Sequence, residues 1–127
     1  MRLFNIRAPN MKENAEVVFL QHGLFESADS WVMNKEKSLA FELAWQGYDV
    51  WLGNSRGNRY SRGHEFLDEF WGQYWDWTMT DMALDLDECI DKVLDETGKK
   101  KVHYIGSGHG ATPVSYTHLT LPTILRV

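Results

Sequence analysis

Apolar and polar residues follow patterns along this chain that predict strands separated by helices. Residues 2–7 alternate, with Phe4 and Ile6 on one face, which predicts a short outer strand. The run AEVVFLQ, residues 15–21, is almost continuously apolar, as expected for a strand buried on both faces of a parallel sheet. Residues 48–53, YDVWLG, predict the next strand of the same sheet.

Two stretches have the apolar spacing of an amphipathic helix. Residues 38–46 predict a short helix, and residues 79–96 carry the clearest helical period of the chain. Acidic residues occupy the other face of the second helix, and their spacing indicates a solvated surface rather than a metal site. The residues expected to cap these helices are Ser38 and either Thr78 or Thr80 at the starts, and Gly47 and Gly98 at the ends.

The stretch VHYIGSGHG, residues 102–110, predicts a buried strand that turns sharply into a helix. Its three glycines, Gly106, Gly108 and Gly110, have the layout of a nucleophile elbow, G-x-S-x-G. In that motif the turn presents a serine hydroxyl, and the next N–H faces the developing oxyanion. Here the central residue is Gly108, so the pattern predicts the frame of a hydrolase site without its nucleophilic oxygen.

The order of these elements predicts an α/β fold, a mostly parallel sheet flanked by helices. The carboxyl edge of that sheet should bring residues 22–24 (His-Gly-Leu) beside residues 106–110. Two backbone donors that face one point in such loops are what the oxyanion of an acyl transfer needs.

Composition narrows the function. The chain has 127 residues and a net charge of −5, which argues against a nucleic-acid partner because phosphate binding requires a basic surface. Its single cysteine, Cys89, lies at a helical core position. No apolar stretch is long enough to cross a membrane, and the first residues do not resemble a signal peptide.

Two further segments allow two interpretations each. The aromatic cluster within residues 66–77 could line an acyl pocket, or it could pack a loop against the sheet. The polar loop at residues 54–62 could bind an anion, or its arginines could hold neighbouring carbonyls and carboxylates.

At these residues the chain resembles the acid lipase family of α/β-hydrolases, the lysosomal acid lipase, gastric lipase and steryl ester hydrolase type. The resemblance covers roughly residues 2–112 and rests on motifs in the order and spacing of the family. They are VVFLQHGLFESADSW (17–31), SLAFELAWQGYDVWLGNSRGNRYSRGH (38–64), EFW (69–71) and VHYIG (102–106).

This resemblance implies a carboxylic ester hydrolase that acts on triacylglycerols or steryl esters through a Ser-His-Asp triad and an acyl-enzyme. The implied partners of the parent protein are a lipid ester substrate and a lipid or membrane surface, and no cofactor or metal is implied. Members of the family are often lysosomal, secreted or membrane-associated.

Carried over by position, the resemblance gives each site residue a role. Leu24 matches the first oxyanion-hole donor, and His109, the residue after the nucleophile position, would give the second through its backbone N–H. Gly108 occupies the nucleophile position, where the family has serine. Ser107 stands one position early, where the turn should rotate its side chain off the site, and it is the alternative nucleophile.

The end of the chain departs from the family. The triad Asp and His of the family lie far downstream of the elbow, and the family's cap domain is not in this chain either. Residues 114–127, VSYTHLTLPTILRV, lack helical spacing and resemble a translated transposase-based sequencing adapter. We therefore expect residues 1–113 to be the N-terminal part of a lipase domain and residues 114–127 to be a non-native tail.

Together these features predict a fragment of a lipid ester hydrolase that is inactive as written. The alternative is a non-catalytic α/β-hydrolase homologue that binds a lipid or a protein partner.

Overall fold

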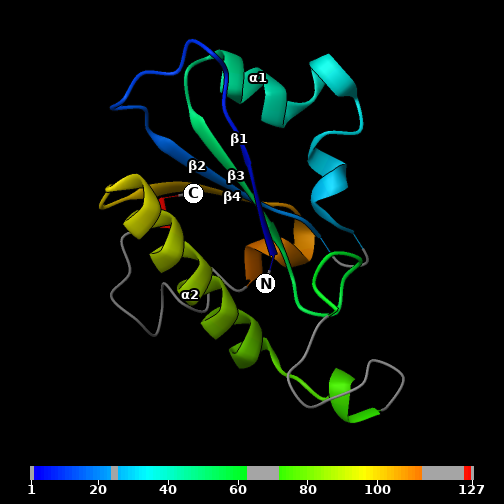
Figure 1. Cartoon of the computed structure of the whole chain (residues 1–127). Helices are drawn as coiled ribbons and strands as arrows, with labels where there is room; N and C mark the ends of the chain where they lie inside the picture. Colours follow the sequence, from blue (N-terminus) through cyan, green and yellow to red (C-terminus); the bar gives the residue numbers. More distant parts are fainter. Residues whose placement is uncertain (1, 24–25, 63–71, 113–124, 127) are drawn as a thin grey trace.

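A computed structural model of the chain describes residues 2–23, 26–62, 72–112 and 125–126 (Figure 1). These residues form one mixed sheet with the strand order β1-β3-β2-β4-β5. The strands are β1 (Arg2–Ile6), β2 (Val17–Gln21), β3 (Asp49–Asn54), β4 (Val102–Gly106) and β5 (Leu125–Arg126). Short 3-10 helices lie at η1 (Ala28–Trp31), η2 (Lys35–Lys37), η3 (Gly72–Trp75) and η4 (Gly108–Ala111).

The two central strands are buried on both faces. Every residue of β2 and of β3 is buried, and β2 runs parallel to both β3 and β4. Near-continuous apolar sequence is needed for such strands, because helices cover both sides of a parallel sheet. The expected strand at residues 15–21, buried on both faces, and the mostly parallel sheet are therefore confirmed, whereas β4, which the sequence predicts to be a buried strand, is only partly buried. The outer strand β1 pairs with β3 in the antiparallel direction.

The two helices α1 (Leu39–Trp45) and α2 (Met79–Thr97) lie on opposite sides of the sheet (Figure 1). Alternate side chains of β2 therefore enter two separate cores. Phe19 packs toward α2 against Leu86 and Val93, whereas Leu20 packs toward α1 against Ala40. Among the described residues, no helix combines the length and apolar composition needed to span a bilayer.

The caps differ in how closely they follow the sequence-based prediction. Thr78 and Asp81 form a reciprocal capping box at the start of α2, and Gly98 ends that helix with a φ of 69°. The Thr78 backbone N–H donates to the Asp81 carboxylate and lowers the pKa of that carboxyl. Ser38 occupies the N-cap of α1, but its buried hydroxyl makes no capping hydrogen bond. Ser38 therefore takes the predicted N-cap position, but its side chain does not bond to the start of the helix.

Candidate active site

Strand β4 leads directly into a tight turn whose outer glycines cannot carry side chains. A Cβ placed on Gly106 would lie 2.7 Å from the backbone nitrogen of Ala111. A Cβ on Gly110 would lie 2.7 Å from the carbonyl oxygen of Gln21 and would also overlap the carbonyl of His22. These contacts are with backbone, so neither can be relieved by rotating a side chain. The turn is therefore closed tightly on itself and on the end of β2.

The middle glycine of the turn is in the opposite situation. Gly108 is exposed, its φ is +52°, and a Cβ placed on it meets no atom within 4 Å. A left-handed residue between two crowded glycines is what a sharp strand-to-helix turn requires. Of the three positions, only residue 108 has room for a side chain.

Backbone hydrogen bonds hold this turn beside the carboxyl end of β2. The Ser107 N–H donates to the Gln21 carbonyl at 3.0 Å, and the Gly110 N–H donates to the Ser107 carbonyl at 2.8 Å. The register pairs Gln21 with Gly106, so the segment that begins at His22 lies next to the turn. The expected neighbourhood of these two loops is confirmed.

His22 is a buried structural residue at this edge. Its Nε2 accepts hydrogen bonds from the Ser55 backbone N–H at 3.0 Å and from the Asn58 amide at 3.1 Å. This assigns the ring proton to Nδ1, which donates to the Gly23 carbonyl at 2.8 Å. Glu26 holds the preceding peptide group, because its carboxylate accepts the Gly23 N–H at 2.9 Å. The backbone that leads to residue 24 is thus held at both its N–H and its carbonyl.

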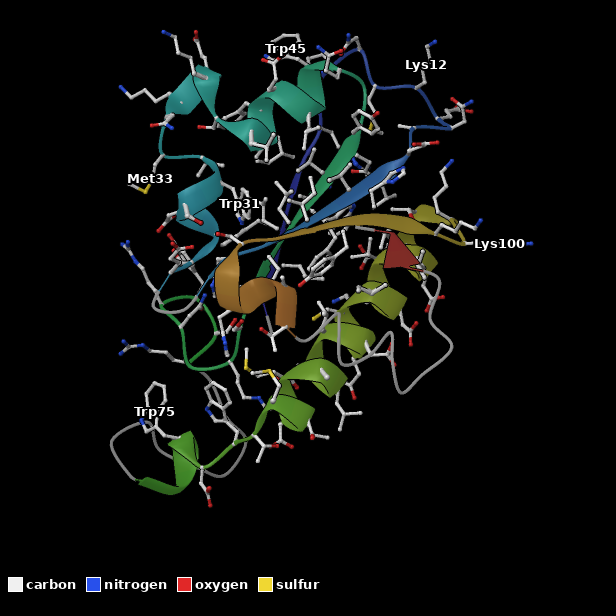
Figure 2. The ribbon with its side chains drawn as sticks, turned by 180° about the vertical axis from the view of Figure 1, so that it is seen from behind. Lys12, Trp31, Met33, Trp45, Trp75 and Lys100 are labelled. Atoms are coloured by element: carbon white, nitrogen blue, oxygen red, sulfur yellow. The ribbon has the colours of Figure 1, made fainter. Side chains whose placement is uncertain are left out.

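A cleft of about 780 Å³ opens beside the turn, along the carboxyl edge of the sheet. Its walls come from the segment after β2, the loop after β3, and the segment that enters α2. Figure 2 shows Met33 and Trp75, from two of these walls, on the same side of the molecule. The Trp75 ring packs closely on Gly57, because a Cβ added to Gly57 would lie only 2.5 Å from that ring. The apolar side chains of the lining are Met33, Trp75, Trp77 and Met82.

The loop after β3 is fixed by its own polar side chains. Asn54 is fully buried, and its side-chain oxygen accepts hydrogen bonds from the Ala28 N–H and from the Asn58 amide. The Tyr60 hydroxyl and Arg59 both contact the Asp29 carboxylate. This supports the interpretation in which side chains of the loop hold neighbouring groups.

Arg56 connects this loop to α2. Its guanidinium makes a two-pronged ion pair with Asp85, at 2.5 and 2.6 Å. That hydrogen bonding raises the pKa of Arg56. Asp85 is a correction to the prediction that the acidic residues of this helix form only a solvated face, because it faces the cleft loop and is largely shielded.

Replacing Asp85 with asparagine should lower the free energy of unfolding by about 1–2 kcal/mol, because one charged partner of a partly shielded pair is lost. Urea unfolding followed by tryptophan fluorescence measures this difference. Asp91→Asn, an exposed acid on the same helix, is the matched control and should change stability by less than about 0.5 kcal/mol. Equal effects of the two substitutions would mean that the Arg56 pair does not stabilise the loop.

The structure brings some of the predicted site residues together and leaves others apart. His109 lines the cleft, next to Gly108 in the turn. Ser107 precedes them as the residue before η4, and neither Ser107 nor Gly108 is among the described residues that line the cleft. Leu24 lies outside the described residues, and so does the first half of the aromatic cluster, residues 66–71.

Two contributors to the site are not foreseen from the sequence. One is Glu26, which lies three residues after Gly23. A capping box has the same spacing between its backbone N–H and its carboxylate, so this spacing could have predicted the contact. Asp85 and Arg56 are separated by 29 residues, and no local pattern connects them. Within the described residues, no group of three His, Cys, Asp or Glu side chains is arranged to hold a metal ion.

Comparison with known proteins agrees with this geometry. Residues 16–125 match the family described as alpha/beta hydrolase fold. The chain is 44% identical to gastric triacylglycerol lipase of Bos taurus over 126 residues, 93% of this chain and 32% of that protein. It is also 44% identical to lipase member K of Mus musculus over 112 residues, 87% of this chain and 28% of that protein. The chain thus spans about a third of the length of these relatives.

Solved structures give the same fold. The thioesterase domain from the curacin biosynthetic pathway superposes with a TM-score of 0.68 at 20% identity, covering 97% of this chain and 38% of that one. Epoxide hydrolase A from Mycobacterium thermoresistibile superposes with a TM-score of 0.64 at 26% identity, covering 97% of this chain and 33% of that one. The chain therefore belongs to the α/β-hydrolase fold family, and within that family it is acid lipase-like.

Proposed function

We propose that this chain carries the ester-binding edge of a lipid ester hydrolase and that, with Gly108 at the nucleophile position, it does not itself form an acyl-enzyme. The observation that carries the proposal is the contrast within the turn. A side chain at Gly106 or Gly110 would overlap backbone atoms, whereas residue 108 has a left-handed backbone and open space for a side chain. A serine at that position would stand clear of the sheet, as a nucleophile must.

The surroundings of the turn support a lipid ester as the ligand class. Gastric triacylglycerol lipase, by its name, acts on triacylglycerols, and this chain is 44% identical to the Bos taurus protein over the aligned region. The cleft beside the turn has methionine and tryptophan side chains in its walls. Flat and flexible apolar side chains of this kind suit an acyl chain. The roles of oxyanion donor for Leu24 and for the backbone N–H of His109 belong to the same proposal, as does the assignment of residues 114–127 as a non-native tail.

A cysteine at position 108 tests whether this position serves an alkyl-binding cleft. In a Cys89→Ala background, Gly108→Cys should react faster with octyl methanethiosulfonate than with methyl methanethiosulfonate, by about tenfold, because the longer chain gains apolar contact. Cys89 is buried, and burial raises the pKa of its thiol, so this cysteine should react slowly with either reagent. Its replacement by alanine leaves position 108 as the site of labelling.

Lys100→Cys in the same background is the matched control. Lys100 is exposed at the opposite side of the molecule from Met33 and Trp75 (Figure 2). A thiol there should show no preference for the longer reagent. The proposal fails if the two cysteines show the same ratio of octyl to methyl rates.

The second candidate is a non-catalytic homologue that binds a lipid or a protein partner. Gly108 favours it, because an exposed left-handed glycine at the centre of the turn has no chemical function of its own. A homologue that binds a lipid also predicts an alkyl preference at position 108, whereas one that binds a protein partner predicts none. A source transcript that encodes Gly108 and continues past residue 113 without a downstream Asp and His would favour the homologue, and an intact pair would favour the hydrolase.

A further inference from the structure

Tyr104 is a fully buried residue of β4 with a polar group at its tip. Its ring stacks on Phe19 of β2, with 5.8 Å between ring centroids and 10° between planes. Both rings belong to the core between the sheet and α2. Packing alone would be served equally well by phenylalanine, so the hydroxyl needs a separate reason.

The hydroxyl of Tyr104 donates a hydrogen bond to the carbonyl of Gly110. That carbonyl belongs to the short 3-10 helix Gly108–Ala111, whose last carbonyls have few partners within the helix. A buried carbonyl without a partner costs free energy, so the tyrosine satisfies a group that the turn itself leaves open. Burial also raises the pKa of Tyr104, so the hydroxyl keeps its proton and remains a donor at neutral pH.

We propose that Tyr104 is a positioning residue that ties the turn at residues 106–110 to the sheet and so sets where residue 108 stands. The hydroxyl holds Gly110 from β4, while Gln21 of β2 holds the same turn through the Ser107 N–H. The backbone of Gly110 is already pressed against β2. The turn is thus fixed from two neighbouring strands on either side of Gly108.

This inference rests on the proposed function, because fixing the turn affects function only if residue 108 occupies the nucleophile position. The two can fail separately. Loss of the tyrosine bond is detected by hydrogen exchange at the turn, whereas the alkyl preference of a cysteine at 108 tests the cleft.

Tyr104→Phe is the test variant, because it removes one oxygen and keeps the stacked ring. Native-state hydrogen exchange should show the Ser107 and Gly110 amides exchanging about tenfold faster, relative to the amides of β2. Tyr48→Phe is the matched control. Tyr48 is half-buried near the opposite end of the sheet, edge-on to His103, so its substitution should leave this ratio unchanged.

An equal change at the turn and at β2 in Tyr104→Phe would overturn the proposal, because the hydroxyl would then stabilise only the fold as a whole. If Tyr104→Phe does not fold, the wild-type chain decides. Carbon-13 labelling of tyrosine Cζ in mixed water and deuterium oxide should resolve a slowly exchanging hydroxyl on Tyr104. A rapidly exchanging hydroxyl there contradicts the bond to Gly110.

Discussion

Gly110→Ala is expected to lower the free energy of unfolding by about 3 kcal/mol or more, the upper range for forcing extra atoms into a closed site. The added methyl would overlap the carbonyls of Gln21 and His22 at the carboxyl end of β2. Either β2 or the turn must move, and β2 is fully buried at the centre of the sheet. Urea unfolding with tryptophan fluorescence measures the loss.

Gly108→Ala is the matched control in the same turn. Its methyl enters open space, and only the left-handed backbone opposes it, so the cost should be roughly 1–2 kcal/mol. Comparable losses for the two alanines would mean that the turn is not closed in the way the structure describes. An unaffected Gly110→Ala protein would contradict the account directly.

The second large effect concerns covalent chemistry. Incubated with an alkyl fluorophosphonate, the chain should gain no adduct mass, because removing a serine nucleophile costs on the order of 10⁶ in kcat. Ser107 is the serine nearest to the nucleophile position in sequence, but it stands one position early, where the turn should rotate its side chain off the site. Its hydroxyl should therefore remain unmodified.

Intact-mass spectrometry of the chain and of Ser107→Ala gives the comparison. The two proteins should behave identically and show no increase in mass. An adduct that appears on the chain and disappears in Ser107→Ala would make Ser107 the working nucleophile. That result would contradict the assignment of residue 108 as the empty nucleophile position.

The main elements of the fold follow from local sequence patterns. The apolar run within residues 15–21 predicts a strand buried on both faces, residues 48–53 predict the next strand, and the helical period of residues 79–96 predicts α2. The two 3-10 helices between residues 28 and 37 carry no such period, and the sequence does not predict them. Their shape depends on polar contacts such as that between Ala28 and Asn54, which form only once the sheet is assembled.

The candidate site divides in the same way. Three glycines spaced by two residues are a local signal, and the turn is found where they predict it. The cleft walls and the pair between Arg56 and Asp85 join residues far apart in the chain. These depend on the order of strands in the sheet, which a single sequence does not specify residue by residue. From the sequence alone, Tyr104 is one more aromatic residue of the core. The role of its hydroxyl becomes visible only when the structure places the Gly110 carbonyl beside it.

A side chain at position 108 should reach the cleft beside the turn. A crystal structure of Gly108→Cys joined by a disulfide to octanethiol shows whether it does. We expect the alkyl chain to lie in the cleft against Met33 and Trp75 while the turn stays in place. An alkyl chain that extends over the outer surface, away from these two side chains, would mean that position 108 does not face the cleft.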